Sequence, residues 1–425
     1  MDDKITPQEH YVAPNQLCLG LHVHLDLSWV EHPFTFSSFK IKTLEQIATI
    51  QSLGLQRVRY SPAKSDGEPL PEPATSPASA APAAIADDDS LYQAKRARLE
   101  RLEAQRAKSA ACEKAFLSST RVIKGINQNM FSQPAVVRQQ ADELVKTMAD
   151  SMLMDADIAI RLMADKIGNE DAYYHSLNVA LLSMMLAKEM KAPAAGIQLV
   201  GLASLFHDAG EVEIPERIVR KSDALTKAEA ALLQQHCAYG VDIGKKLGLP
   251  PEVQAVILQH HECVDGSGYP RGLHGPQISL LARIVALVNA YDELCNPPNP
   301  VNAMTPHEAL STLYAQRRDR FDPLAMTTFV RCMGVYPPGT VVALSNGALA
   351  LVVSVNTSRP LKPTVLVYDP AVPKSEAIVV DLEQEPEVTV SKTLKPSQLP
   401  PAVFDYLSPR RRTAYYFNAE SGKPG

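Results

Sequence analysis

The chain has 425 residues, of which 45% are hydrophobic and 21% charged, and its formal net charge is −5. This length allows two or three domains with at least one sizeable core. The small acidic surplus argues against an extended surface for nucleic acid or anionic membranes. We therefore expect a small-molecule partner and no nucleic acid polymer.

The sequence shows no targeting or membrane-spanning signal. Its first residues are acidic and polar without an apolar stretch, so we expect no secretory signal. The most apolar segment, residues 278–294, is interrupted by Arg283 and Asp292 and is too short to span a bilayer. The cysteines are scattered singly, which fits a reducing compartment. We expect a cytoplasmic protein without a transmembrane segment.

Residues 1–62 are predicted to form a small α+β module. Apolar residues alternate as in a strand that bends at Gly20, and Thr43 is expected to cap a helix that ends at Gly54. None of the histidines of this module has ligand spacing. A role in packing or in binding a protein partner is therefore expected rather than chemistry. The three histidines are His22, His24 and His32.

Residues 63–90 are rich in Pro, Ala, Ser, Asp and Glu, which predicts a linker without a core of its own. Residues 91–118 have a strongly helical composition with mostly polar faces. A solvated helix that docks on one side is the first interpretation. Pairing with a second copy as a short coiled coil, and hence a homodimer, is the alternative, although few heptad positions support it.

Residues 91–335 are predicted to form one helical domain whose core begins near residue 130. Its apolar residues recur at helical spacing. We expect helices over 136–148, 152–167, 171–190 and 194–207, from Thr226, from Pro250, and over 277–294.

The spacing of the apolar residues changes after residue 334 from a helical to a strand-like pattern. Residues 336–395 contain four apolar runs with turn residues between them, which predicts a small β-rich appendage. Residues 396–425 are expected to be a tail whose Arg410, Arg411 and Arg412 form a solvated cluster. The expected fold class is mainly α, with a helical bundle between a small α+β module and this appendage.

Potential metal ligands are concentrated in residues 205–269. This window holds four of the eleven histidines, and on the helix before it Asp171 and His175 lie one turn apart. Imidazole and carboxylate together suit iron, manganese or zinc better than magnesium. Because no Cys-x-x-Cys spacing occurs here, a structural zinc site is not expected. The four histidines are His207, His236, His260 and His261.

The order of these residues resembles the HD-GYP domain, the bacterial branch of the HD phosphohydrolases that hydrolyses cyclic di-GMP. The resemblance covers about residues 130–345 and implies an HD-type helical bundle. The N-terminal module, around Trp29, and the β appendage are similar to accessory parts of one subgroup. The matching residues are His175, His207-Asp208, His236, His260-His261-Glu262, Asp265-Gly266-Ser267-Gly268-Tyr269-Pro270 and Asp292.

Carried over residue by residue, the resemblance implies two divalent ions, iron or manganese, and a third where Asp171 supports one. Asp208 would bridge the two ions, with His207 and Asp208 at the catalytic centre. Such a pair of ions supplies a bridging hydroxide for attack on a phosphodiester, which would give linear pGpG and, as an open extension, GMP. The implied ligands are Asp171, His175, His207, Asp208, His236, His260, His261 and Asp292.

One wall of the substrate cleft would be formed by Gly268, Tyr269 and Pro270, with Arg271 beside them. Two positions depart from the family's pattern. Glu211 stands where a lysine commonly contacts the substrate phosphate, and residues 298–302 lack a basic segment. Since cationic contacts to phosphate are strong, we expect normal metal binding and a weakened hold on the substrate, unless Arg271, Arg283 or the N-terminal module supplies it.

Three functional interpretations therefore stay open. The first is a metal-dependent phosphodiesterase acting on cyclic di-GMP in bacterial signalling. The second is a catalytically weak or inactive domain that binds cyclic di-GMP or a protein partner. The third is hydrolysis of another nucleotide, because ligand residues alone do not specify the pocket.

Overall fold

The computed structural model describes most of the chain. The described residues are 10–27, 32–34, 36–71, 114–154, 159–162, 171–221, 223–297, 299–356, 359–370, 372–374, 377–407 and 415–417, with four single residues between 93 and 107. They form two compact units. The first comprises residues 1–105 with 344–348 and 368–378, and the second comprises 106–343, 349–367 and 379–425. Two short loops of the C-terminal region thus cluster with the N-terminal module.

The first unit is built on an antiparallel sheet in the order β1-β4-β2-β3. The predicted bent strand is wrong in detail, because a 3-10 turn and a turn at Gly20, whose φ is 86°, divide it into β1 and β2. The predicted cap is confirmed, since Thr43 Oγ1 accepts a bond from Gln46 N at 3.2 Å. The elements are β1 His10–Val12, η1 Pro14–Gln16, β2 His22–His24, β3 Ser38–Lys40, α1 Leu44–Ser52, β4 Val58–Tyr60 and η3 Pro62–Lys64.

Apolar side chains between this sheet and its helix form the core of the first unit. Leu21, Val23 and Ile50 are completely buried there. The linker predicted after residue 62 and the polar helix predicted over 91–118 lie largely outside the described residues, as does Trp29. Helical structure is described at residues 114–129.

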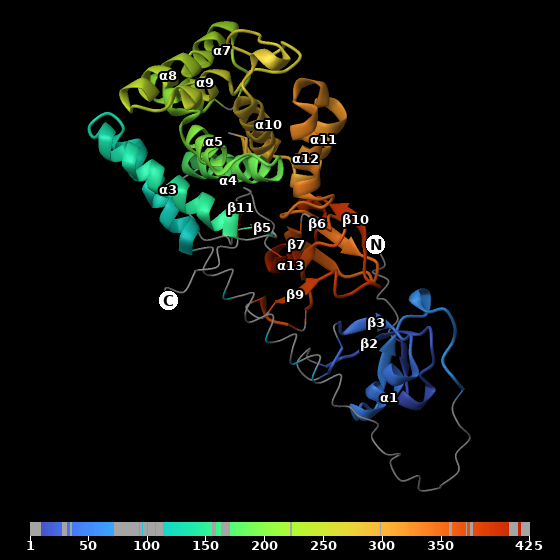
Figure 1. The fold of residues 1–425 in the computed structure, drawn as a ribbon. Helices are drawn as coiled ribbons and strands as arrows, with labels where there is room; N and C mark the ends of the chain where they lie inside the picture. The colour runs from blue at the N-terminus through green and yellow to red at the C-terminus, as the bar shows by residue number, and fades with distance from the viewer. Residues whose placement is uncertain are drawn as a thin grey trace, which may run out of the picture. The chain divides into compact units, whose positions relative to one another are not determined.

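The second unit is mainly helical (Figure 1). Its helices are α3 Pro134–Met154, α4 Asp171–Glu189, α5 Ala194–Phe206, η4 Ala209–Glu213, α6 Glu216–Val219, α7 Lys227–Gln234, α8 His236–Lys246, α9 Pro251–Gln259, η5 Gly275–Gln277, α10 Leu280–Cys295, η6 Pro300–Asn302, α11 Pro306–Gln316, η7 Arg318–Arg320 and α12 Pro323–Met333. The predicted mainly α fold class is confirmed.

Helices α4 and α5 form the centre of this bundle. They pack on each other, on α3 on one side and on α9 and α10 on the other (Figure 1). Residues 177–187 of α4 and 200–206 of α5 are buried almost without interruption, as their dense apolar sequence predicts. The ends of these central helices therefore lie at fixed places inside the bundle, where they position the candidate ligands.

A seven-stranded sheet completes the second unit. Its main order is β10-β6-β7-β5-β11, and β8 pairs with β7 and β9. The four strands predicted in residues 336–395 are present, and β10 and β11 are additional. The elements are β5 Ala159–Leu162, β6 Val341–Leu344, β7 Leu349–Asn356, β8 Thr364–Val367, β9 Ile378–Asp381, β10 Val390–Leu394, η9 Pro396–Gln398, α13 Pro401–Leu407 and β11 Tyr415–Phe417.

The helix predicted over residues 152–167 is wrong. Helix α3 continues only to Met154, and residues 159–162 form strand β5 between β7 and β11. The alternation of Ile158, Ile160 and Leu162 with smaller or polar residues is the period of a strand. Residues 415–417, which were expected to lie in a solvated tail, add a strand to the same sheet.

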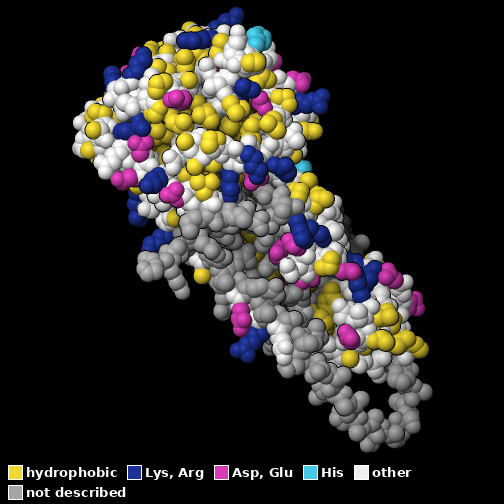
Figure 2. Space-filling view, viewed as in Figure 1, with side chains coloured by type: hydrophobic (Ala, Val, Ile, Leu, Met, Phe, Trp, Pro, Cys, Tyr) yellow, Lys and Arg dark blue, Asp and Glu magenta, His cyan; other side chains and the backbone are white. Residues whose placement is uncertain are grey.

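The surface carries charges of both signs. On the face shown in Figure 2, the basic and acidic side chains of the described residues are interspersed rather than gathered into a broad basic field. None of the helices that the structure describes is long and apolar enough to cross a membrane.

Candidate metal centre

Three of the candidate histidines are held in the same local way. His207 and His260 directly follow the last residues of α5 and α9, and His236, the first residue of α8, lies two residues beyond the end of α7. The last carbonyls of a helix lack a partner within it. Each Nδ1 donates to the carbonyl three residues earlier, at 2.8 Å to Ser204, 2.7 Å to Leu233 and 2.8 Å to Ile257. This bond orients all three rings with Nε2 pointing into the site.

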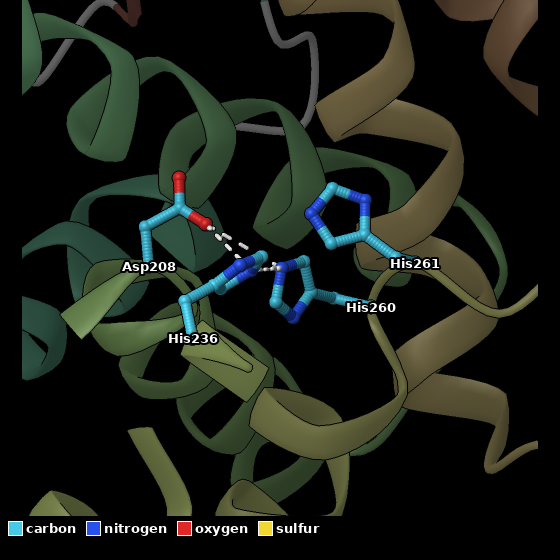
Figure 3. A group of neighbouring side chains, drawn as sticks. All are labelled: Asp208, His236, His260 and His261. Carbon is cyan, nitrogen blue, oxygen red and sulfur yellow. Dashed lines mark hydrogen bonds and ion pairs between the residues drawn. The ribbon is translucent and has the colours of Figure 1, made fainter. Parts of the chain in front are cut away.

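Asp208 lies between two groups of these Nε2 atoms. Its Oδ2 is 3.0 Å from His207 Nε2 and 3.4 Å from His175 Nε2. Its Oδ1 is 3.4 Å from His260 Nε2 and 3.6 Å from His236 Nε2, as the dashed lines in Figure 3 show. A single carboxylate thus presents one oxygen to each pair of imidazoles.

The Nε2 atoms that face each other in the two histidine pairs need a positive charge near them. His236 Nε2 lies 3.1 Å from His260 Nε2, and His175 Nε2 lies 3.2 Å from His207 Nε2. A neutral imidazole that donates through Nδ1 carries its lone pair on Nε2. Two such lone pairs at hydrogen-bond distance repel each other unless a proton or a metal ion lies near both. The donor set therefore fits bound metal.

The ligand-type side chains of the described residues form two groups that share Asp208. One contains Asp208, His236, His260 and His261, and the other contains His175, His207 and Asp208, each with its ligand atoms within 4.8 Å of one another. A mixed imidazole and carboxylate set suits first-row divalent metals. Each group could accordingly hold a metal ion, and Asp208 belongs to both groups.

The charges of the centre reinforce this fit. Although burial alone would raise it, the positive charge of His207 and hydrogen bonds from His175, His207 and His260 hold the pKa of Asp208 well below its usual value. Burial lowers the pKa of His260 to about 4 and that of His261 well below its usual value. At neutral pH Asp208 is thus ionised beside the neutral imidazoles of His260 and His261, which is the protonation state in which these residues bind metal.

Comparison with known proteins agrees with this arrangement. Residues 133–324 match a family model described as an HD domain, residues 11–141 a domain of unknown function, and residues 341–401 a KOW domain associated with the HD domain. The cyclic di-GMP phosphodiesterase PA4108 of Pseudomonas aeruginosa is 30% identical over 373 residues, which cover 84% of each chain. The chain belongs to the HD domain phosphodiesterase family.

Further similarities are shorter or more distant. The 3'3'-cGAMP-specific phosphodiesterase 3 of Vibrio cholerae is 30% identical over 164 residues, which cover 38% of this chain and 35% of that protein. The solved structure of Bd1817, a HDG"Y"P protein from Bdellovibrio bacteriovorus, matches with a TM-score of 0.43 and 14% identity. That match covers 76% of this chain and 98% of that chain.

One predicted ligand of this HD phosphodiesterase, Asp292, lies outside the two groups. Asp292 is fully buried, and its Oδ2 lies 2.7 Å from Nδ1 of His175. Its Oδ1 accepts bonds from Asn178 and Asn296, both at 2.9 Å. Asp292 is thus placed to orient His175 from behind, as carboxylates that support metal-bound histidines are. Asp171 begins α4, but its side chain is outside the described part of the structure. Both remain predictions as ligands.

The His175 ring is further fixed by its charge. Burial alone would lower the pKa of His175, but hydrogen bonds to Asp208 and Asp292 raise it well above the usual value. In the metal-free protein this imidazole therefore holds a proton between two carboxylates. A bound ion would replace that proton, so metal binding at this group would release it.

The Gly-Tyr-Pro loop lies against the group that contains His236, His260 and His261. The Tyr269 ring stacks on His261, with centroids 4.5 Å apart and an angle of 22° between the planes. Glu262 is buried and accepts bonds from Arg271 N at 2.7 Å and Leu273 N at 2.8 Å. A Cβ on Gly268 would lie 2.3 Å from Cys263 N, so only glycine fits there. The loop thus lies beside the ligand residues, while Arg271 is exposed, and the role of the loop as a wall of a substrate cleft stays a prediction.

Two additional carboxylates surround the centre. Burial and the negative charge of Asp208 raise the pKa of Glu211, in η4, to about 8. Burial within the surrounding protein and the negative charge of Asp208 also raise the pKa of Glu293, although solvent reaches its side chain. Glu293 was not predicted. Its position directly after Asp292 on α10 is the only signal in the sequence that could have indicated it.

Replacing Glu211 with glutamine is expected to stabilise the metal-free protein at alkaline pH. Between about pH 4.5 and 8 the folded state retains a proton that the unfolded state releases, so this residue lowers stability as the pH rises. The advantage of Glu211→Gln should be small at pH 5 and reach about 1–3 kcal/mol at pH 8. Urea unfolding in a chelator at both pH values measures it.

Glu213→Gln is the matched control, because Glu213 lies in the same short helix and is exposed. Its effect should not depend on pH over this range. An advantage of Glu211→Gln that stays constant from pH 5 to 8 would show that Glu211 is ionised throughout.

Proposed function

We propose that this HD phosphodiesterase hydrolyses cyclic di-GMP to linear pGpG in a metal-dependent reaction of bacterial signalling. The observation that supports this most strongly is the carboxylate of Asp208 set between two converging pairs of histidines. The substrate is suggested by the cyclic di-GMP phosphodiesterase PA4108, which is similar over 84% of its length. Onward hydrolysis of pGpG to GMP would use the same centre.

The metal is proposed to be iron or manganese. His175 and His207 would hold one ion, His236, His260 and His261 the other, and Asp208 both. Two bound divalent ions supply an activated water and polarise the phosphodiester. Nitrogen-rich sites of this type favour such metals over magnesium. Asp171 is the residue through which a third ion would be held.

The chain's own groups have three tasks around the ions. The backbone carbonyls behind His207, His236 and His260 keep those rings oriented. Asp292 does the same for His175. The loop that Glu262 anchors forms one wall of the cleft and places the Tyr269 ring beside the ligands.

A second candidate function is a weak or inactive domain that binds a cyclic dinucleotide or a protein partner. Glu211 supports it, because its carboxyl group offers no positive charge to a substrate phosphate where the family commonly has a lysine. The cGAMP-specific relative makes 3'3'-cGAMP the obvious alternative substrate.

The five cysteines of the described residues are free, in keeping with the proposed cytoplasmic location. A protein partner for residues 1–62 and a homodimer belong to this proposal as well.

The proposal is tested by measuring substrate turnover in the wild type and in Glu211→Lys, which restores a lysine at this position. Protein purified anaerobically and loaded with iron(II) or manganese(II) is incubated with cyclic di-GMP or 3'3'-cGAMP, and the products are separated by chromatography. Linear pGpG is the expected product. Glu211→Lys should lower KM for cyclic di-GMP about tenfold, since a charge-assisted contact contributes about 1.5–3 kcal/mol.

Glu211→Gln separates the effect of removing the carboxyl group from the effect of adding a cation. A metal-loaded Glu211→Lys protein that binds substrate no better than Glu211→Gln would mean that this position does not face the phosphate. Two bound metals without any linear product would favour the binding module. Faster turnover of 3'3'-cGAMP would change the proposed substrate.

A further inference from the structure

The loop of residues 263–278 carries the Gly-Tyr-Pro wall, and hydrogen bonds within the loop stabilise it near both ends, among them Gly266 N to Cys263 O at 2.8 Å and Ile278 N to Gly275 O at 3.1 Å. Ser267 N and Oγ donate to Asp265 Oδ1 at 2.9 and 2.7 Å, and Gly275 N donates to Val264 O at 3.0 Å. Glu262 holds the middle of the loop through the amides of Arg271 and Leu273. Both ends of the loop are held from outside.

Arg320, in η7, holds the first end. Val264 N donates to Arg320 O at 2.9 Å, and Arg320 Nη2 donates to Cys263 Sγ at 3.3 Å. Burial alone would raise the pKa of Asp265, but hydrogen bonds from Ser267 and the positive charge of Arg320 lower it. One arginine thus contacts the loop through its backbone, its guanidinium and its charge.

Asp322, two residues further, holds the second end through Arg283. Arg283 Nη1 donates to Asp322 Oδ2 at 2.7 Å, and Arg283 Nε donates to Ile278 O at 3.1 Å. Ile278 is the last residue of the loop and is completely buried. The Asp322 Oδ1 atom caps α12 by accepting from Leu324 N and Ala325 N, both at 3.0 Å. Asp322 is therefore itself fixed, and only 12% of its side chain is exposed.

We propose that Arg320 and Asp322 are positioning residues that hold the two ends of the 263–278 loop and thereby set the affinity of the cleft for its cyclic dinucleotide. Neither residue touches the metal centre. The segment lies some fifty residues beyond the loop in the sequence, and no motif that marks the metal centre includes it. The effect on affinity rests on the proposed function, whereas the effect on the loop does not.

Arg320→Met is the principal test. In the metal-loaded protein it should raise KM for cyclic di-GMP about tenfold and change kcat less than about threefold, because the loop is displaced while the metal centre stays intact. Hydrolysis of bis(p-nitrophenyl) phosphate, a small diester that requires the metal centre, should be unchanged. Hydrogen exchange of residues 263–275 should accelerate, while that of α5 and α8 should not.

Three further variants complete the test. Arg318→Met is the matched control, since Arg318 lies in the same turn, is 66% exposed and pairs only with its neighbour Asp319 among the described residues. It should behave as wild type. Arg320→Lys, which keeps a cation, should restore part of the affinity. Asp322→Asn keeps the helix cap but loses the charge that pairs with Arg283, and it should loosen the same loop if Arg320→Met fails to fold.

The outcomes separate this inference from the proposed function. Unchanged loop exchange and unchanged KM in Arg320→Met and Asp322→Asn would overturn the inference. So would an equal loss on both substrates accompanied by loss of metal. If the wild type cleaves bis(p-nitrophenyl) phosphate but not cyclic di-GMP, the proposed substrate is wrong, and hydrogen exchange still decides whether these residues position the loop.

Discussion

Asp208→Asn is expected to abolish phosphodiester hydrolysis, with kcat falling by about a thousandfold or more. Asparagine keeps the shape of the side chain but removes the negative charge, and it replaces one ligand oxygen with an NH₂ group. Since Oδ1 and Oδ2 face different pairs of histidines, one pair must lose its shared ligand whichever way the amide turns. We expect metal content to fall together with activity.

Metal analysis and product chromatography on the same preparation measure both effects. Asp242→Asn is the matched control, because Asp242 lies on α8 near the site but is exposed and pairs with Lys245. It should retain its metal and its turnover. An Asp208→Asn protein with two bound ions and at least a tenth of the normal activity would show that Asp208 does not serve both groups.

Gly210→Ala is the second substitution with a large expected effect. A Cβ at this position would lie 2.0 Å from His236 O and 2.5 Å from Gly240 N. These are backbone atoms of α8, so they cannot rotate away, and η4 and α8 must separate. We expect a loss of about 3 kcal/mol or more in the free energy of unfolding. Because Asp208 and His236 lie on the two separated segments, metal binding should weaken as well.

Gly125→Ala provides the comparison. Gly125 lies within the helix of residues 114–129, and a Cβ there would meet no atom within 4 Å. The same change should therefore stabilise that helix by about 0.5–1 kcal/mol. Urea unfolding of the metal-free variants measures both changes. If Gly210→Ala were as stable as the wild type and kept its metal, the close approach of η4 and α8 would not matter for the site.

The helix ends that carry ligands could be predicted because they depend on local signals. Thr226 caps α7 as its sequence indicates, and Pro251 begins α9, which His260 directly follows. His236, expected on the helix from Thr226, is instead the first residue of α8. The partners of those ligands could not be predicted in this way. His175 and Asp292 are 117 positions apart, and only the packing of α4 on α10 brings them together.

The wrong helix prediction for residues 159–162 has the same cause, namely contacts with residues far away in the sequence. Residues 159–162 form a strand because β7 and β11, both far along the chain, supply its hydrogen-bonding neighbours. Apolar residues on a short segment fit a helix or a strand about equally until such partners are known. Likewise, the motif indicated that Glu262 matters, but it did not indicate that its carboxylate accepts hydrogen bonds from the backbone amides of Arg271 and Leu273.

The single carboxylate shared by two ligand groups couples their occupancies. An ion at one group changes the charge that Asp208 presents to the other, and such coupling is reciprocal, so each group alters the affinity of the other by the same factor. If each group holds an ion, the two ions do not bind independently. The fraction of protein with both groups filled would then not follow the metal concentration as a simple hyperbola.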